Sequence, residues 1–175
     1  MAVSKLMIRC CFLLLSIFAS SFCLANTQSS MQGQLAPGFS LADLNSDAQV
    51  DLKNYRGKVV YVDFWASSCF ACRKSFPFLN KLRHKYAPQG FEIVAVNTDL
   101  AKQDALNFLA KYPLNYPAVW DQHGTSFSAY QVRALPTGFL IDASGKIRLV
   151  HLGFSERHEA YLIAHVEKLL AEMIE

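Results

Sequence analysis

The sequence predicts an α/β fold in which helices cover both faces of a central mixed β-sheet. Three observations lead to this fold class. The run 59–65 is almost entirely apolar, which is typical of a central strand buried on both faces. Strand-like and helix-like segments then alternate along the chain. The alternation ends in two adjacent strands and a final helix, an order that favours a mixed sheet. We also expect an extra N-terminal β-hairpin and a central β-α insert.

The first 25 residues have the layout of a secretory signal. Lys5 and Arg9 precede the apolar run CCFLLLSIF, and Cys23 and Ala25 supply small residues before a cut after Ala25. The apolar stretch barely reaches the roughly 20 residues that a membrane span needs, so cleavage is favoured over an uncleaved membrane anchor. This signal predicts export to the periplasm, with a membrane-anchored protein as the alternative.

The chain is therefore divided into a signal peptide (1–25), a flexible tether (26–35) and one folded domain (36–175). The tether is the polar, Ser/Gln-rich run that lacks periodicity. Cleavage leaves Cys69 and Cys72 as the only thiols, in a compartment where disulfides persist. It also lowers the formal net charge from +3 to +1, because two basic residues leave and all 14 acidic ones remain. No basic surplus points to nucleic acid.

Alternating residues predict the first elements of the domain. Phe39–Leu41 and Val50–Leu52 alternate on either side of a polar turn at Asn45–Asp47, which suits a small β-hairpin. The residues Arg56–Lys58 then turn the chain into the strand 59–65.

Periodicity and turn residues place the remaining elements. A helix follows Cys69 and contains Pro77, which removes one backbone donor and should kink it. The later elements are expected in this order: a strand at 91–97, a helix at 101–112, a short strand at 118–120, a short helix at 124–130, strands at 137–141 and 147–152, and a helix from about Ser155, capped by that serine. The residues of the last helix expected to face the core are Leu162, Val166, Leu169, Leu170 and Met173.

Cys69 and Cys72 lie three residues apart at a strand-to-helix junction, and this spacing predicts a redox pair. The start of a helix favours negative charge, so the pKa of the more exposed Cys69 should be lowered. Cys69 then attacks a substrate disulfide, and Cys72 attacks Cys69 to release the reduced product. Asp63 lies in the apolar strand that feeds the pair. If it is buried there, its pKa is raised and it can accept the Cys72 proton near neutrality; a solvent-facing Asp63 is the open alternative.

Metal and haem chemistry are disfavoured for this pair, and we expect no cofactor. A closed zinc site needs four ligands, but there is no second CxxC and no histidine at ligand spacing. Four of the histidines look like surface residues: His123, His151, His158 and His165. Covalent haem attachment needs histidine directly after the second cysteine, where Arg73 stands. A purely structural disulfide is improbable, because a two-residue loop constrains little of the unfolded chain.

The segment FWASSCFACRKSFP resembles the active-site segment of thioredoxin-like proteins, most closely the exported TlpA/ResA-type thiol–disulfide oxidoreductases, which include the cytochrome c maturation thioredoxins. The resemblance runs from Ala36 to the C-terminus through APGFSLADL, GKVVYVDFWAS, FEIVAVNTD and ALPTGFLIDASGKI. It implies a thioredoxin-like fold, with Asp63 as the buried acid of the family. It also implies a cis-proline at Pro136, which would expose the Leu135 backbone for strand-like pairing with the substrate.

The resemblance also marks where this chain departs from its relatives. Ser68 stands where the family usually has tryptophan, and Phe70-Ala71 lacks both the proline of thioredoxin and the histidine of strongly oxidising relatives. The pair should therefore lie near the reducing end of the thioredoxin-like range. We assign the substrate-binding surface to Leu135, Pro136, Trp65 and Ser68. The acidic residue that ResA-type proteins carry after the central strand has a counterpart near Asp99.

The resulting expectation is an exported reductase of disulfides in periplasmic proteins, supplied with electrons by a membrane thiol-electron transporter. Two alternatives are weighed against it. A peroxiredoxin-like peroxidase needs threonine or serine three residues before its reactive cysteine, where Ala66 stands, and a proline further upstream, of which 59–69 has none. A Sco-like copper-binding metallochaperone has cysteines four apart, whereas here the spacing is three.

Overall fold

The computed structural model describes residues 31–46 and 48–174. The signal peptide expected at 1–25 lies outside the described residues, as does the first part of the expected tether, 26–30. Within the described part, each helix is too short or too polar to cross a membrane.

A five-stranded mixed sheet forms the centre of the domain, with strand order β5-β4-β3-β6-β7. The parallel strands are β3 (Val59–Trp65), β4 (Phe91–Asn97) and β5 (Ala118–Trp120). Antiparallel β6 (Thr137–Ile141) and β7 (Ile147–Leu152) complete it. All five strands have the predicted bounds. Every residue of β3 is buried, because β3 is paired on both edges and covered on both faces.

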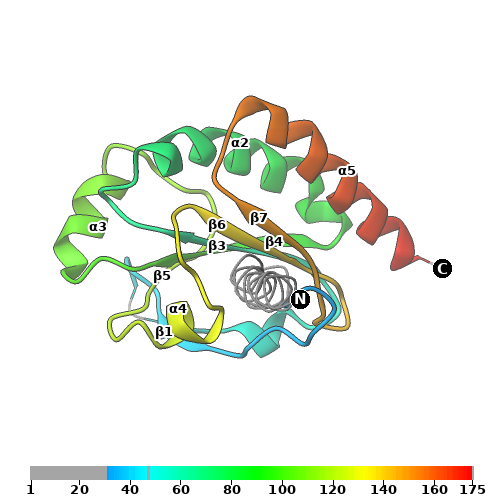
Figure 1. Ribbon diagram of the computed structural model, residues 1–175, viewed down its shortest axis with the longest axis horizontal. Coiled ribbons are helices and arrows are strands. Elements are labelled where there is room, and N and C mark those ends of the chain that lie inside the picture. Colours follow the sequence, from blue (N-terminus) through cyan, green and yellow to red (C-terminus); the bar gives the residue numbers. More distant parts are fainter. Residues whose placement is uncertain (1–30, 47, 175) are drawn as a thin grey trace, which may run out of the picture. The chain divides into compact units, whose positions relative to one another are not determined.

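Helices cover both faces of this sheet, as predicted (Figure 1). α2 (Phe70–Tyr86) and α5 (Glu156–Glu172) lie on one face, and α4 (Thr125–Ala129) lies on the other. Successive side chains of a strand point to opposite faces, so β3 serves two cores. Val59, Tyr61 and Trp65 pack with α2 and α5, whereas Val60, Val62 and Phe64 pack against the opposite cluster.

The predicted N-terminal hairpin is formed by antiparallel β1 (Ser40–Ala42) and β2 (Gln49–Asp51). A 3-10 turn, η3 (Leu52–Tyr55), follows it, and a second one, η4 (Ala87–Gln89), ends the α2 segment. The Leu44 N–H donates to the Ala118 carbonyl at 2.7 Å, so the hairpin is attached to the edge strand β5.

The described fold begins at Met31, five residues before the predicted start of the domain. Met31 is 3% exposed and belongs to the cluster opposite α2. The Gly33 N–H donates to the Ile147 carbonyl at 2.7 Å, and the Ile147 N–H donates to the Gln34 carbonyl at 2.9 Å. Residues 31–35 of the expected tether are therefore paired with the start of β7. Backbone hydrogen bonds make most of this attachment. Such bonds do not depend on side-chain type, so the polar composition of residues 31–35 does not predict their pairing with β7.

Two helices differ from expectation at their ends. α3 (Lys102–Leu109) ends before the predicted Tyr112, in keeping with the proline at 113, which disfavours helix in the residue before it. Ser155 precedes α5 as predicted, but its side chain makes no capping hydrogen bond. The three leucines and one valine of α5 that were predicted to face the core are buried, whereas Met173 follows the end of the helix and is 37% exposed.

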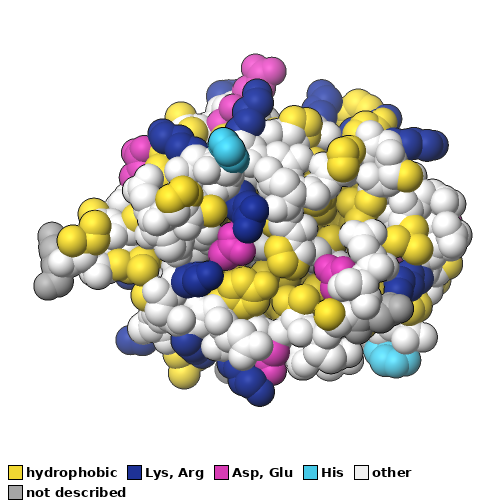
Figure 2. Space-filling model, turned by 180° about the vertical axis from the view of Figure 1, so that it is seen from behind, with side chains coloured by type: hydrophobic (Ala, Val, Ile, Leu, Met, Phe, Trp, Pro, Cys, Tyr) yellow, Lys and Arg dark blue, Asp and Glu magenta, His cyan; other side chains and the backbone are white. Residues whose placement is uncertain are grey.

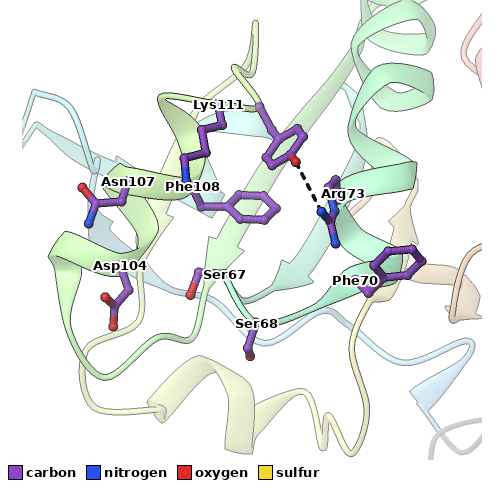
Figure 3. Close-up of a pocket in the computed structure, with 9 residues that line it drawn as sticks. Ser67, Ser68, Phe70, Arg73, Asp104, Asn107, Phe108 and Lys111 are labelled. Atoms are coloured by element: carbon purple, nitrogen blue, oxygen red, sulfur yellow. Dashed lines mark hydrogen bonds between the residues drawn. The ribbon is translucent and has the colours of Figure 1, made fainter.

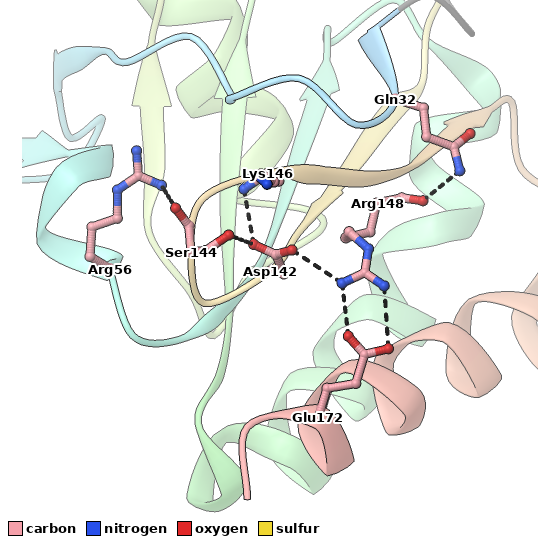
Figure 4. Close-up of polar contacts among 7 residues, drawn as sticks. All are labelled: Gln32, Arg56, Asp142, Ser144, Lys146, Arg148 and Glu172. Atoms are coloured by element: carbon pink, nitrogen blue, oxygen red, sulfur yellow. Dashed lines mark hydrogen bonds and ion pairs between the residues drawn. The ribbon is translucent and has the colours of Figure 1, made fainter. Parts of the chain in front are cut away.

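Polar contacts fix the turn between β6 and β7 and join it to α5 (Figure 4). The Asp142 carboxylate accepts from the Ser144 hydroxyl at 2.6 Å and from the Lys146 N–H at 2.9 Å. Arg148 donates to Asp142 at 3.2 Å and makes a two-pronged ion pair with Glu172 at 2.8 and 3.2 Å. The last turn of α5 is thereby tied to the far edge of the sheet.

Lys and Arg side chains are spread over the face that Figure 2 shows. They alternate there with acidic and uncharged side chains, and the described residues on this face form no continuous basic patch.

We expect Gly145→Ala to destabilise the protein more than the matched variant Gly33→Ala. Both glycines have φ of 86°, a conformation that costs an L-residue about 1–2 kcal/mol. A Cβ at Gly33 meets nothing within 4 Å, whereas one at Gly145 would lie 0.9 Å from Arg56 Nη1. The guanidinium must then leave, losing its hydrogen bond to the Ser144 carbonyl, which adds up to about 1 kcal/mol. Denaturant unfolding measures both losses; equal losses would contradict the argument.

Candidate active site

The cysteine pair lies where β3 passes into α2. Cys69 is the N-cap of α2 and Cys72 lies one turn further in, with the two sulfurs bonded at 2.03 Å. Cys69 is partly exposed, whereas Cys72 is fully buried. The Cys72 backbone N–H donates to Cys69 Sγ at 3.1 Å. A thiolate on Cys69 would thus receive a backbone hydrogen bond at the positive end of a helix, which lowers a thiol pKa.

Asp99 fixes the turn that precedes the pair. Its carboxylate accepts the Ser67 backbone N–H at 2.9 Å and the Ser67 hydroxyl at 3.0 Å. The Asn97 side-chain amide donates to the same carboxylate at 2.8 Å, and Trp120 Nε1 donates to the Asp99 carbonyl at 2.8 Å. Asp99 therefore holds the approach to Cys69 against the ends of β4 and β5. This is the structural setting of the acidic residue noted after the central strand.

Asp63 is buried in the middle of β3, with 1% of its surface exposed. Its neighbours in register are Ala95 on β4 and Gly138 on β6. Burial raises the pKa of its carboxyl from 3.8 to about 8, and Oδ2 has no hydrogen-bond partner among the described residues. A solvent-facing Asp63 is thereby excluded. At pH 7 the group is mainly protonated, and it becomes a carboxylate as the pH rises through about 8.

Trp65, expected on the substrate surface, is fully buried. Its ring packs edge-on against Phe76 of α2, with ring centroids 5.2 Å apart, and at a tilt of 37° against Phe108 of α3, with centroids 5.3 Å apart. As the last residue of β3, Trp65 points into the core shared with Cys72 and supports the cysteine turn from beneath. It offers no surface to a substrate in this structure. Ser68, in contrast, is exposed on the turn itself.

The Leu135–Pro136 peptide bond is cis, the isomer implied by the resemblance. The Pro136 carbonyl accepts the Gly153 N–H at 2.8 Å, which ties this segment to the end of β7. Leu135 is half-buried and, like Cys69, packs at the margin of the core that contains Cys72. Its backbone groups make no hydrogen bond within the described part of the chain.

A hollow of about 300 Å³ adjoins the cysteine turn on the α3 side (Figure 3). Arg73 donates to the Tyr112 hydroxyl at 3.4 Å and stacks 4.6 Å over the ring of Phe70, which is 62% exposed. The hollow therefore joins aromatic surface to cationic groups. Its lining residues are Ser67, Ser68, Phe70, Arg73, Asp104, Asn107, Phe108, Lys111 and Tyr112.

A histidine missed by the sequence analysis lies near this site. His151, expected at the surface, is 6% exposed, and its Nδ1 lies 3.0 Å from the Tyr61 hydroxyl. The signal was available in β7, where Ile147, Leu149 and His151 alternate with more exposed residues. His158 at the start of α5 is half-buried, and its ring meets that of His151 edge-on at 4.8 Å.

Comparison with known proteins gives consistent matches. Residues 32–150 match the AhpC/TSA family. The thiol-disulfide oxidoreductase ResA of Bacillus cereus is 33% identical over 93% of this chain and 97% of its own, and that of Bacillus subtilis is 37% identical over 85% and 86%. A solved Chlorobium tepidum structure named as thiol:disulfide interchange protein DsbE superposes with a TM-score of 0.77 and 40% identity, over 79% of this chain and 97% of that one.

These matches cover the cysteine turn, the buried acid and the cis-proline segment together. They agree with the thioredoxin-like fold and with a pair of cysteines at disulfide distance. The chain belongs to the ResA-type thiol–disulfide oxidoreductases.

Proposed function

We propose that this oxidoreductase acts as a reductase, with Cys69 as the attacking and Cys72 as the resolving cysteine. The asymmetry of the pair is the observation that carries the proposal. Solvent reaches Cys69, whose sulfur accepts a backbone N–H, whereas Cys72 is sealed in the core. Membership of the family implies disulfide-bearing proteins as substrates.

The reaction begins with the reduced pair. The Cys69 thiolate attacks a client disulfide, forms a mixed disulfide and displaces the first client thiolate, which takes a proton from solvent. Asp63 is mainly protonated at pH 7, so it must first lose its own proton. The Cys72 thiol then gives its proton to the Asp63 carboxylate, and the resulting thiolate attacks Cys69 Sγ. The second client thiolate leaves. Two electrons have then passed to the client, and the protein holds the Cys69–Cys72 disulfide.

Client docking is assigned to the surface around Cys69. The backbone of Leu135, which has no hydrogen bond within the described part of the chain, suits strand-like pairing with an extended client segment, beside Pro136. Ser68 lies on the exposed turn, next to the hollow on the α3 side. A second hollow, of about 530 Å³, lies between Lys74 of α2 and the Phe154–Glu159 segment at the start of α5.

We further propose that the protein is exported to the periplasm by the signal in residues 1–25. Reduced nicotinamide cofactors are absent there, so a membrane thiol-electron transporter would restore the dithiol. An uncleaved segment would instead hold the domain at the membrane.

We expect Cys72→Ser to trap clients on Cys69 as mixed disulfides. The variant keeps the accessible attacking sulfur but lacks the thiol that releases the client. Trapped complexes are detected by non-reducing electrophoresis and identified by mass spectrometry. Cys69→Ser is the matched control and should trap nothing. Stronger trapping by Cys69→Ser would reverse the two roles, and an empty trap in both variants would argue against a reductase.

The proposed direction predicts a reducing potential for the pair. Equilibration with glutathione should place it nearer to thioredoxin, at about −270 mV, than to the oxidant DsbA, at about −120 mV. The reason is that no side chain between the cysteines adds a donor that would hold the thiolate. The reduced protein should also reduce insulin. A potential close to that of DsbA would make the protein an oxidase.

Asp63→Asn should remove a pH dependence of stability. The folded-state pKa of Asp63 is raised to about 8, so the unfolded state releases this proton first. The wild type therefore loses stability relative to the variant as the pH rises from about 4 to 8, by on the order of 4 kcal/mol at pH 7. Denaturant unfolding of the oxidised proteins across this range measures the difference. A constant difference between the two proteins would show that Asp63 titrates normally.

A further inference from the structure

A chain of polar side chains leads from the centre of the sheet to the start of α5, and the reaction above makes no use of it. Tyr61 on β3 and His151 on β7 are both buried and lie 3.0 Å apart, from hydroxyl to Nδ1. The His151 ring meets the ring of His158 edge-on, with centroids 4.8 Å apart. His158 is half-buried in the first turn of α5, so the chain ends near solvent.

Gly138 brings the inner end of this chain close to Asp63. Gly138 is the register partner of Asp63 on one side and of His151 on the other. A Cβ at Gly138 would lie 1.8 Å from the Tyr61 hydroxyl oxygen, so the hydroxyl occupies the place of the missing side chain. Side chains directly opposite on paired antiparallel strands have Cβ atoms about 4.5–5.5 Å apart. The Tyr61 hydroxyl therefore occupies the Gly138 position, between the register places of Asp63 on β3 and His151 on β7. Burial and the nearby Asp63 charge both raise the pKa of Tyr61.

This series of polar side chains, together with Asp63, includes buried polar atoms that have no hydrogen-bond partner among the described residues. Asp63 Oδ2, His151 Nε2 and His158 Nδ1 lack hydrogen bonds among the described residues. Unpaired buried polar groups destabilise a fold, and apolar side chains would fill these places without that penalty. The two unpaired ring nitrogens belong to rings that meet edge-on but share no hydrogen bond, and the unpaired carboxyl oxygen belongs to Asp63, two residues after Tyr61 on β3. Such an arrangement suits proton transfer better than packing.

We propose that Tyr61, His151 and His158 are positioning residues that conduct the proton of Asp63 to solvent during the resolving step. The proposal rests on the function proposed above, in which Asp63 takes the Cys72 proton. The Asp63 carboxylic acid donates to the Tyr61 oxygen while the Tyr61 hydroxyl proton moves to His151 Nδ1. The two rings meet edge-on without a hydrogen bond, so a ring rotation brings His151 Nε2–H to His158 Nδ1, and His158 then releases its Nε2 proton to solvent. Asp63 is left as a carboxylate, which can then take the Cys72 proton in the resolving step.

Other titratable groups around Asp63 give the proton no comparable exit. Cys72 of α2 belongs to the core on the Tyr61 side of β3, and burial and the nearby Asp63 charge raise the pKa of Tyr116, which lies before β5. Among the described residues the buried Tyr116 hydroxyl has no hydrogen-bond partner, and no ring contact joins Tyr116 to a histidine. Burial and the neighbouring His158 lower the pKa of His151 to about 4, so a proton passes through His151 and does not stay there.

Dithiobis(nitrobenzoate) separates the two chemical steps in one experiment. Cys69 of the reduced protein attacks the reagent and releases one coloured thiolate, and Cys72 then resolves the mixed disulfide and releases a second. Tyr61→Phe and His151→Gln should slow the second release about tenfold and leave the first unchanged. Glutamine can still accept the Tyr61 hydrogen bond but cannot pass a proton on. Tyr116→Phe is the matched control, a buried tyrosine near Asp63 outside the chain, and should match the wild type in both releases.

A variant of His158 tests the solvent end of the proposed proton path. His158→Gln should slow the second release, and added imidazole should restore it, because a diffusible base can replace a half-buried side chain. A second release at the wild-type rate in His151→Gln, or equal slowing in Tyr116→Phe, would overturn the proposal. Loss of the second release from the wild type itself would instead refute the assignment of Cys72 as the resolving residue. The equilibrium potential should stay unchanged in the three chain variants, since the chain alters a rate.

Discussion

The burial of β3 on both faces is the constraint on which the site depends. The strand is paired along both edges and covered by two separate cores, so none of its residues reaches water. A carboxyl in this position must give up its solvation, and this is the cause of the raised pKa of Asp63. The strand also delivers the chain to the start of α2, where Cys69 caps the helix. One constraint thus sets the position of the thiol pair and the raised pKa of Asp63, the proposed proton acceptor.

Hydrogen bonds from the ends of other strands fix the two segments beside the cysteine pair, the turn at Ser67 and the segment at Pro136. On one side Asp99 joins the cysteine turn to the ends of β4 and β5, through bonds to Ser67, Asn97 and Trp120. On the other side the Pro136 carbonyl is bound by Gly153, at the end of β7. Cys69, the proposed attacking residue, lies in the turn between β3 and α2, where Ser68 beside it is exposed. Rigid strands therefore position a site whose client-facing surface is made of short loops.

Sequence patterns predicted the elements correctly wherever buried residues recur at the regular spacing of a strand or helix. The strands at 59–65, 91–97 and 137–141 match their predicted bounds, and Cys69 is the more exposed of the two cysteines, as predicted. The misses have physical causes. Met31 is one apolar residue in a polar segment attached through its backbone. Trp65, predicted on the substrate surface, is turned inward by the alternation of β3. His151, predicted at the surface, faces the core from its place in β7.

The missing side chain at Gly138 links three positions that lie far apart in the sequence. A methyl group there would displace the Tyr61 hydroxyl, and without that hydroxyl His151 loses its one hydrogen bond among the described residues. Glycine at 138, tyrosine at 61 and histidine at 151 therefore form a single packing unit that cannot be altered one member at a time without loss. In an evolving lineage these three positions are expected to change together, so that a relative with a larger residue at 138 also carries a smaller or apolar residue at 61.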